Sequence, residues 1–264
     1  IDNIEIVDQN PIGRSSRSNP ATYSKAYDSI RKIFSSEGNS QGIEIKPSDF
    51  SFNVDGGRCE DCLGEGTKKI EMQFMADIYL ECDTCKGKRF KNKVLEIKIN
   101  KKNIYDVLKM TIEEALTFFS FSKSIQNKLT PLNDVGLGYL TLGQSSSTLS
   151  GGEAQRLKLA SYLGDDNKKN KNKTLFIFDE PTSGLHNKDI ANFMSSISRL
   201  VDLGNSVIII EHNTELIKQA DWIIDLGPGG GEKGGEICFE GTPKDLVKTQ
   251  NNKTAKYLKK HFVN

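Results

Sequence analysis

Short apolar runs separated by helical segments dominate the second half of the chain. Runs rich in β-branched and aromatic residues at 174–178, 206–210 and 222–226 predict strands. Helical sequence lies between these runs, beginning at Leu149. Strands that alternate with helices are typical of a parallel sheet covered by helices, so the predicted fold class is α/β.

The first half of the chain predicts a wider mixture of elements. A short strand is expected at residues 4–8, followed by a polar loop and a helix that begins at Pro20 with Asn19 as its cap. Cys238, in a strand-like run, is expected to be a small core residue. The remaining predictions are strand-like alternation at residues 68–74 and 94–99, helices over residues 103–140 with a capping box at 111–114, and a solvated loop in the Lys/Asn-rich stretch 165–173.

Composition and charge limit the classes of protein. Hydrophobic residues make up 36% and charged residues 27%, as in soluble globular domains rather than disordered or fibrous chains. The 36 basic and 35 acidic side chains exclude a uniformly basic nucleic-acid coat, so electrostatic binding must come from local patches. The longest apolar runs hold four residues, against about 18 for a membrane span, and no leader-like pattern indicates secretion. The chain begins with Ile1 rather than Met, so we expect it to be a piece of a longer protein.

Four of the five cysteines form two Cys-x-x-Cys pairs, with 19 residues between the pairs. This spacing predicts a tetrahedral zinc site with Cys59, Cys62, Cys82 and Cys85 as ligands. Four thiolates leave no open coordination position, so the metal would be structural rather than catalytic. The alternatives are two disulfides, which would call for an export signal, and a redox dithiol, which would be a single pair beside a βαβ unit.

An apolar strand that ends in two acids is a candidate nucleotide site. Residues 175–178 precede Asp179 and Glu180, and the carboxyl ends of strands in open α/β sheets bind ligands. Four apolar residues followed by an aspartate is the Walker B pattern, in which the aspartate helps to hold Mg²⁺ on a nucleotide phosphate. The next carboxylate, Glu180, is a candidate general base for an attacking water. Two acids after an apolar strand also occur by chance.

Residues 149–156, Leu-Ser-Gly-Gly-Glu-Ala-Gln-Arg, predict the start of a helix. Ser150 is the expected cap and Glu153 completes a capping box, while Gly151 and Gly152 allow a ligand to approach the backbone. A helix N-terminus attracts anions, and a nucleotide γ-phosphate is one. The alternative is a well-capped helix after a glycine turn, with no ligand.

A cluster of basic side chains follows the second cysteine pair. Residues 86–102 hold eight basic residues and a single acid, Glu96. Such a cluster binds phosphate in a salt-dependent manner with little sequence preference, which suits recognition of DNA by its deformability. The alternative is a solvated strand face, and Arg14 and Arg17 are weaker candidates for DNA contact. The main candidates are Lys68, Lys69, Lys86, Lys88, Arg89 and Lys91, with Lys93, Lys98, Lys101 and Lys102 beyond them.

The segment 149–156 resembles the signature motif of ABC ATPases, and it precedes the Walker-B-like strand as in that family. Residues 181–186 resemble the D-loop of the family, and His212, at the end of a strand taken to be buried, resembles its switch histidine. Gln9 would match the Q-loop glutamine that reaches metal and water. The alternatives are a core histidine for His212 and an ordinary polar loop residue for Gln9. His186 and His261 are left as structural or exposed.

The sequence has no Gly-x-x-x-x-Gly-Lys-Ser/Thr phosphate loop. In the ABC family this loop precedes all the segments above, so we expect the chain to begin just downstream of it. We therefore expect the chain alone to hydrolyse ATP little or not at all.

Several further segments look like the UvrA family of bacterial nucleotide-excision-repair proteins. They are residues 8–14, 17–23, 50–59, 134–139 and 220–228. The resemblance covers nearly the whole chain and implies the C-terminal part of the second nucleotide-binding domain. It implies three regions: residues 1–50 as the start of the ATPase core with the Q-loop, 51–148 as the zinc-bearing insertion and helical signature subdomain, and 149–264 as the ATPase core with the remaining motifs.

The resemblance implies a cytoplasmic, ATP-hydrolysing DNA-damage sensor that dimerises, binds damaged double-stranded DNA and loads UvrB, with ATP, Mg²⁺ and Zn²⁺ as cofactors. Asp179, Glu180, Gln9 and His212 would serve the nucleotide of this domain. The signature residues Ser150, Gly151, Gly152 and Glu153 would instead lie at the γ-phosphate held by the first nucleotide-binding domain of the same protein.

Two other functions stay open from the sequence. One is a non-enzymatic, zinc-stapled DNA-binding or dimerisation fragment, which the missing phosphate loop favours. The other is the nucleotide-binding domain of an ABC transporter. The cysteine-bearing insertion argues against it, and no membrane partner helix or coupling segment is recognisable.

Overall fold

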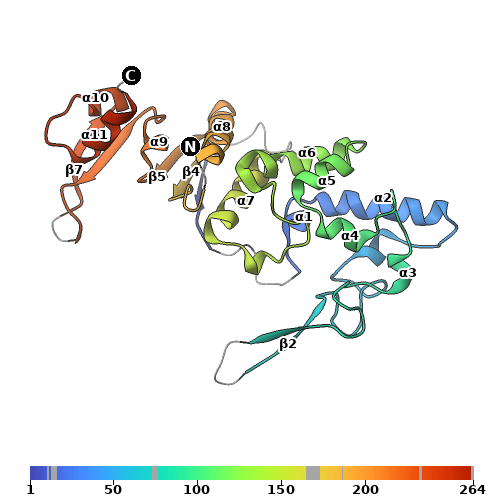
Figure 1. Ribbon diagram of the computed structural model, residues 1–264. Coiled ribbons are helices and arrows are strands. Elements are labelled where there is room, and N and C mark those ends of the chain that lie inside the picture. Colours follow the sequence, from blue (N-terminus) through green and yellow to red (C-terminus); the bar gives the residue numbers. More distant parts are fainter. Residues whose placement is uncertain are drawn as a thin grey trace. The chain divides into compact units, whose positions relative to one another are not determined.

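Two compact units make up the chain in the computed structural model (Figure 1), which describes residues 1–10, 12, 17–72, 77–164, 173–185, 187–231 and 234–262. The sheet unit comprises Ile1–Ile6 and Lys173–Asn264, and the helical unit comprises Val7–Asn172. None of the described helices has the length and apolar character needed to cross a membrane.

A three-stranded sheet in the order β1-β4-β5 forms the centre of the sheet unit. Strands β4 and β5 are parallel, with Leu175 opposite Ser206 and Asp179 opposite Ile210. Phe176 and Phe178 of β4 are buried, and Phe178 meets Phe193 of α8 edge-on at 6.2 Å between ring centroids. The predicted α/β class is therefore confirmed. The elements are β1 (Asn3–Val7), β4 (Thr174–Asp179), α8 (Asn187–Asp202), β5 (Ser206–Ile210) and α9 (Thr214–Ile217).

One face of this sheet is open in the described structure, so the expectation that His212 follows a buried strand is wrong. Burial alternates along β5, and Ile208 and Ile210 are 50% and 51% exposed. Ile4 and Ile6 of β1 are exposed as well. The apolar run predicted burial, but α8 covers one face of the sheet only.

The third predicted strand of the parallel sheet belongs to a separate antiparallel hairpin. Strand β6 pairs with β7, with Ile223 opposite Gly241 and Gly227 opposite Glu236. A parallel pair needs a crossover connection of a dozen or more residues, whereas only the glycine-rich segment 228–235 links these two strands. Cys238 is exposed on β7, which corrects its expected place in the core. The elements are β6 (Ile223–Gly227), β7 (Glu236–Gly241), α10 (Pro243–Leu246), α11 (Lys253–Leu258) and the 3₁₀ turn η6 (Lys259–His261).

Short capped helices build the helical unit, as the capping signals predicted. Asn19 caps α1 and Thr111 caps α5, each with a reciprocal capping box. Helix α2 buries Ile30 and Phe34, and the latter meets Phe50 at 5.7 Å between ring centroids. The elements are α1 (Pro20–Tyr23), α2 (Ala26–Ser40), η1 (Pro47–Phe50), α4 (Ile104–Lys109), α5 (Ile112–Phe118), α6 (Lys123–Leu132), η2 (Asn133–Leu137), η3 (Ser146–Thr148) and α7 (Gly151–Leu163).

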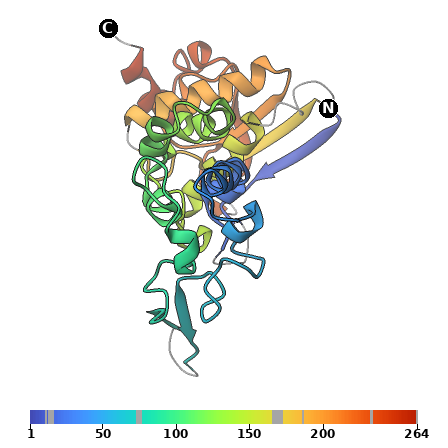
Figure 2. The same cartoon turned by 90° about the vertical axis from the view of Figure 1, so that its right-hand side faces the viewer.

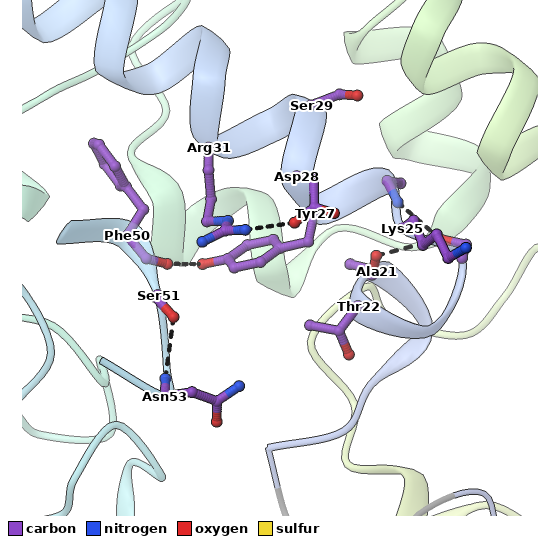
Figure 3. A network of polar contacts seen from close by, with 12 residues as sticks. Ala21, Thr22, Lys25, Tyr27, Asp28, Ser29, Arg31, Phe50, Ser51 and Asn53 are labelled. Carbon is purple, nitrogen blue, oxygen red and sulfur yellow. Dashed lines mark hydrogen bonds and ion pairs between the residues drawn. The ribbon is translucent and has the colours of Figure 1, made fainter. Parts of the chain in front are cut away.

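A polar network fixes α2 to the segment that leads into the cysteines (Figure 3). The buried Tyr27 hydroxyl donates to the Phe50 carbonyl at 2.7 Å, and its ring stacks on Phe52 at 4.9 Å between centroids. Arg31 pairs with Asp28 and lies 5.8 Å from the centroid of the Tyr27 ring. The start of the cysteine region is thereby attached to the helices.

The cysteine region carries an antiparallel hairpin that extends away from the helices of this unit (Figures 1 and 2). It consists of β2 (Thr67–Ile70) and β3 (Ile78–Glu81). The first predicted strand, 68–74, is thus confirmed only to Ile70: residues 71 and 72 are not in a strand, and 73–74 lie outside the described residues. The second, 94–99, is wrong: α3 (Asn92–Leu95) begins it, and only Ile99 forms an isolated bridge. Val94 and Ile97 are buried three residues apart, a spacing that one helical turn places on the same face and that a strand would place on opposite faces.

Candidate functional site

Two acids stand at the carboxyl end of β4, as the sequence predicted. Asp179 is the last residue of the strand and Glu180 follows it, with both side chains exposed. The Glu180 amide continues the ladder to β5 by donating to the Ile210 carbonyl at 2.9 Å. Glu180 has φ 44°, in the left-handed region, so the chain turns sharply at this residue.

His212 lies beside Glu180. The Nε2 atom of His212 is 3.6 Å from Oε1 of Glu180, and β5 ends only two residues before the histidine. Adjacent parallel strands therefore bring the predicted base and the predicted switch histidine to one edge of the sheet. Both side chains are accessible to a ligand, since His212 is 85% and Glu180 52% exposed.

Glu211 was missed in the sequence and connects the two loops at this edge. Its Oε1 accepts hydrogen bonds from the amide of Thr182, at 3.0 Å, and from the Thr182 hydroxyl. Its Oε2 accepts from the amides of His212 and Asn213, at 2.8 and 2.9 Å. Partial burial acts to raise the pKa of Glu211, but these hydrogen bonds outweigh it and lower the pKa. The only signal in the sequence was a carboxylate directly before the histidine.

The signature segment forms the capped helix that the sequence predicted. The Ser150 hydroxyl accepts a hydrogen bond from the Glu153 amide and donates one to Oε2 of Glu153. The hydroxyl of Tyr139 donates to Oε1 of the same carboxylate at 2.6 Å. Burial raises the pKa of Tyr139 to about 12, together with the contact to Glu153. Tyr139 was not predicted as part of this site, and its spacing from the helix gave no signal.

Gln9 lies against the start of this helix. A Cβ built on Gly151 would be 2.8 Å from both Cβ and Oε1 of Gln9, so any other residue there requires Gln9 or the helix to shift. The chain beside Gln9 is held by helix α7 as well, because Lys158 pairs with Asp8 and donates to the Asn10 carbonyl at 3.0 Å. The structure therefore joins Gln9 to the signature helix within the helical unit. Its predicted role beside Asp179 stays a prediction.

The four predicted zinc ligands come together and are all buried. Their Sγ atoms lie within 4.8 Å of one another, with 3.9 Å between Cys59 and Cys82 and 3.6 Å between Cys62 and Cys85. A tetrahedral zinc site with Zn–S bonds of about 2.3 Å has sulfur atoms about 3.8 Å apart, so the set fits zinc.

The electrostatics of this cluster also call for a cation. Burial raises the pKa of Cys62 and raises that of Cys85 to about 12, whereas the backbone amide of Cys85 lowers the pKa of Cys82 to about 7. Four neighbouring thiolates are unstable without a compensating positive charge. The Gly66 amide donates to Sγ of Cys62 at 3.2 Å, as expected around a thiolate ligand. The thiols are separate, with no disulfide among them.

The basic residues around the cysteines differ in their availability. Lys86 and Lys88 are exposed, and neither has an acid partner among the described residues. The Arg89 guanidinium points inward, since it donates to the Gly143 carbonyl at 3.2 Å and lies 5.6 Å from the Phe52 ring centroid. The other three main candidates pair with acids: Lys68 with Asp61, Lys69 with Glu71 and Asp77, and Lys91 with Glu60. The outlying candidates Lys93, Lys98, Lys101 and Lys102 are exposed, and Lys93 donates to the Glu44 carbonyl at 3.1 Å.

Some predicted features lie outside the described residues, namely Arg14, His186 and all of the 165–173 loop except Lys173. Arg17 pairs with Glu65 at 3.6 Å. Both ring nitrogens of His261 have partners: Nδ1 lies 2.8 Å from the Glu215 carboxylate, and Nε2 lies 2.8 Å from the Thr214 hydroxyl.

A parallel β4–β5 pair that ends in Asp179, Glu180 and His212, together with a capped Ser-Gly-Gly-Glu helix, defines the core elements of an ABC-type ATPase fold. Comparisons with known proteins make the assignment more specific. No family model matches the chain. The chain is 55% identical over 262 residues to UvrABC system protein A of Clostridium perfringens and 52% identical over 262 residues to that of Aquifex aeolicus.

These matches cover 99% of this chain but 28% of each relative, so the chain spans less than a third of the length of the curated relatives. The crystal structure of UvrA2 from Deinococcus radiodurans superimposes with a TM-score of 0.88 at 43% identity, over 98% of this chain and 32% of that one. The resemblance to UvrA predicted from the sequence is therefore confirmed.

Proposed function

We propose that this chain is the part of a UvrA-type ATPase that follows the phosphate loop of the second nucleotide-binding domain. The whole protein would recognise damaged double-stranded DNA in nucleotide excision repair and load UvrB. The observation that carries the proposal is the meeting of Glu180 and His212 at 3.6 Å, at the carboxyl ends of adjacent parallel strands. The similarity to UvrABC system protein A over 99% of the chain supports it.

The residues at this edge fit the hydrolysis of a nucleoside triphosphate. Asp179 would hold Mg²⁺, and the bound Mg²⁺·ATP would supply the electrophilic phosphorus and charge neutralisation. The Glu180 carboxylate would accept a proton from the attacking water. His212 would orient that carboxylate and the terminal phosphate of the nucleotide. Gln9 would reach the metal and the water. The sequence lacks a phosphate loop, so we expect these residues to act only within the longer protein.

The signature helix would act on a different nucleotide. Ser150, Gly151 and Gly152 form the N-terminus of α7, a helix of 13 residues. At the start of a helix of this length, the free backbone amides and the helix dipole favour a phosphate. In the proposed arrangement this phosphate is the γ-phosphate held by the first nucleotide-binding domain. ATP would then hold the two domains together, hydrolysis would release them, and the protein would also dimerise with itself.

The cysteine module would connect these motions to DNA. Cys59, Cys62, Cys82 and Cys85 would hold one structural Zn²⁺, and the exposed Lys86 and Lys88 next to the second pair would contact DNA phosphates. We keep the proposed division into residues 1–50, 51–148 and 149–264 for these functional parts.

Glu180→Gln in the full-length protein tests the assignment of the base. We expect ATP binding to persist and turnover at this site to fall by about 100-fold or more, because general base catalysis contributes about 10²–10⁴-fold. Glu240→Gln is the matched control, since Glu240 is an exposed carboxylate on β7 of the same unit. Turnover unchanged by Glu180→Gln would remove Glu180 from the proposed mechanism.

A non-enzymatic DNA-binding or dimerisation module is the second candidate for the isolated chain. The exposed Lys86 and Lys88 and the absence of a phosphate loop from the sequence favour it. Salt-dependent DNA binding by the chain without ATP hydrolysis supports this role in isolation and agrees with the role proposed for the longer protein.

A further inference from the structure

The two oxygens of the Glu211 carboxylate accept hydrogen bonds from two different loops. Oε1 accepts from the amide and the hydroxyl of Thr182, in the loop that follows β4. Oε2 accepts from the amides of His212 and Asn213, in the loop that follows β5. His212 also approaches Glu180 across the same two loops.

We propose that Glu211 is a positioning residue, which sets the distance between the Glu180 carboxylate and the His212 ring by fixing both loops to one rigid group. The inference rests on the proposed function, since it concerns how the hydrolytic residues are held. Glu211 touches neither reacting atoms nor nucleotide in this role. It acts through Thr182 on one side and through the backbone of His212 on the other.

The geometry of the β4 loop explains why it needs such a fixed point. Glu180 turns the chain in the left-handed region, with φ 44°, and Gly184 does so again with φ 75°. Apart from the bonds to Glu211, local backbone bonds brace this loop: the Ser183 amide donates to the Glu180 carbonyl at 3.1 Å and the Leu185 amide to the Thr182 carbonyl at 3.0 Å. A sharply turned residue keeps its conformation only where its surroundings fix it.

The β5 loop is held by the same carboxylate at its start, before Asn213 caps α9. The amides of His212 and Asn213 have left the sheet ladder, and both point at Oε2 of Glu211. The His212 ring itself is 85% exposed and receives no packing that would hold it. The position of the ring toward Glu180 therefore depends on the backbone that Glu211 holds.

An amide cannot replace this carboxylate. An ionised carboxylate offers about four acceptor positions on its two oxygens. Glu211 is the acceptor in all four of its hydrogen bonds to the two loops. Glutamine keeps one oxygen, which can serve only one loop, and turns its NH₂ group toward the donors of the other. The lowered pKa of Glu211 agrees with a carboxylate that stays ionised in the folded protein.

The test uses the full-length protein and five variants: Glu211→Gln, Thr182→Val, the two combined, Glu240→Gln as the matched control, and Glu180→Gln. The loss of turnover in Glu180→Gln defines the turnover that belongs to this site. The readouts are the rate of ATP hydrolysis at saturating ATP, the ATP dissociation constant and the temperature of thermal unfolding.

We expect Glu211→Gln to lower the hydrolysis rate about 10- to 100-fold, because displacements of about 1 Å at a reacting group can cost about 100-fold. The ATP dissociation constant should change by less than about two-fold, since a positioning residue affects the rate and not the binding of the ground state. Thr182→Val should lower the rate less, and the double variant should equal Glu211→Gln, because both changes break the same link. Glu240→Gln should match the wild type.

A turnover at this site in Glu211→Gln within about two-fold of the wild type, with the turnover at this site lost in Glu180→Gln, overturns the inference and leaves the proposed function standing. A total turnover in Glu180→Gln equal to that of the wild type overturns the proposed function instead. If Glu211→Gln unfolds at a markedly lower temperature, Thr182→Val decides: a stable Thr182→Val protein with the wild-type rate overturns the inference, and a stable one with a reduced rate supports it.

Discussion

Gln9 and Gly151 touch so closely that no side chain fits between them: a Cβ on Gly151 would lie 2.8 Å from Cβ of Gln9. The contact places the predicted Q-loop residue directly on the first turn of the signature helix. Gly151 is not among the residues with positive φ, so its backbone would accept alanine. The restriction at this position is one of space.

Gly151→Ala should therefore disturb function more than stability. Overpacking costs about 1–3 kcal/mol and the better helix propensity of alanine returns about 1 kcal/mol, so the free energy of unfolding should fall by about 0–2 kcal/mol. ATP turnover of the full-length protein should fall by about ten-fold or more, because Gln9 or the signature helix must move. Gly230→Ala, at a glycine with no atom within 4 Å of the added Cβ, is the control and should leave both unchanged.

Zinc content provides the test of the cysteine module. Cys62→Ser should reduce bound zinc to below one equivalent per chain, because a closed four-thiolate set cannot lose a ligand without losing affinity. Limited proteolysis should then cut within residues 51–91. Cys238→Ser is the matched control, since Cys238 is exposed on β7 and outside the cluster. One full equivalent of zinc in Cys62→Ser would exclude this ligand.

DNA binding should depend on Lys86 and Lys88, the exposed main candidates that have no acid partner among the described residues. Replacing Lys86 and Lys88 with alanine should weaken binding at all sequences alike and reduce the slope of log affinity against log salt by about one per lost phosphate contact. The control replaces the exposed Lys244 and Lys256 of the sheet unit. An equal effect of both pairs would mean that the binding is not local to the cysteine module.

Acid should destabilise the chain through its hydrogen-bonded carboxylates. Burial acts to raise the pKa of Glu153, but hydrogen bonds from Tyr139 and Ser150 lower it overall, and the pKa of Glu211 is lowered too. A carboxyl whose folded pKa lies below its unfolded value stabilises the fold fully above the unfolded value, near 4.5 here. That stabilisation is lost as the pH falls through the folded pKa.

Urea unfolding at pH 7, 5 and 4 checks this expectation. The free energy of unfolding should decline at the acid end of the series, and Glu153→Gln should decline less steeply than the wild type because it has no carboxyl to protonate. A Glu153→Gln profile parallel to that of the wild type would show that this group does not contribute.

Local signals in the sequence predicted much of the fold. The caps at Asn19, Thr111 and Ser150 form as expected, because a capping box involves residues only three apart. The four cysteine ligands were equally predictable, because the spacing of the two Cys-x-x-Cys pairs specifies two turns that face one metal ion.

Contacts between distant residues were not predictable in the same way. The antiparallel partner of β6 and the packing of Gln9 on Gly151 depend on how remote segments meet. The role of Glu211 was not predictable because it comes from hydrogen bonds that backbone amides donate to its carboxylate. Every residue except proline has such an amide, so the sequence does not show which amides will meet the carboxylate. Within the predicted site, the residues that carry charge toward a ligand were found, and those that hold them in place were not.

The exposed isoleucines of β1 and β5 affect the solubility of the isolated chain. Ile4, Ile6, Ile208 and Ile210 are each at least half exposed on the two outer strands of the described sheet. Outer strands with apolar side chains are templates for pairing with another chain. The isolated polypeptide should therefore self-associate as its concentration rises, and its solubility should improve when these positions carry lysine.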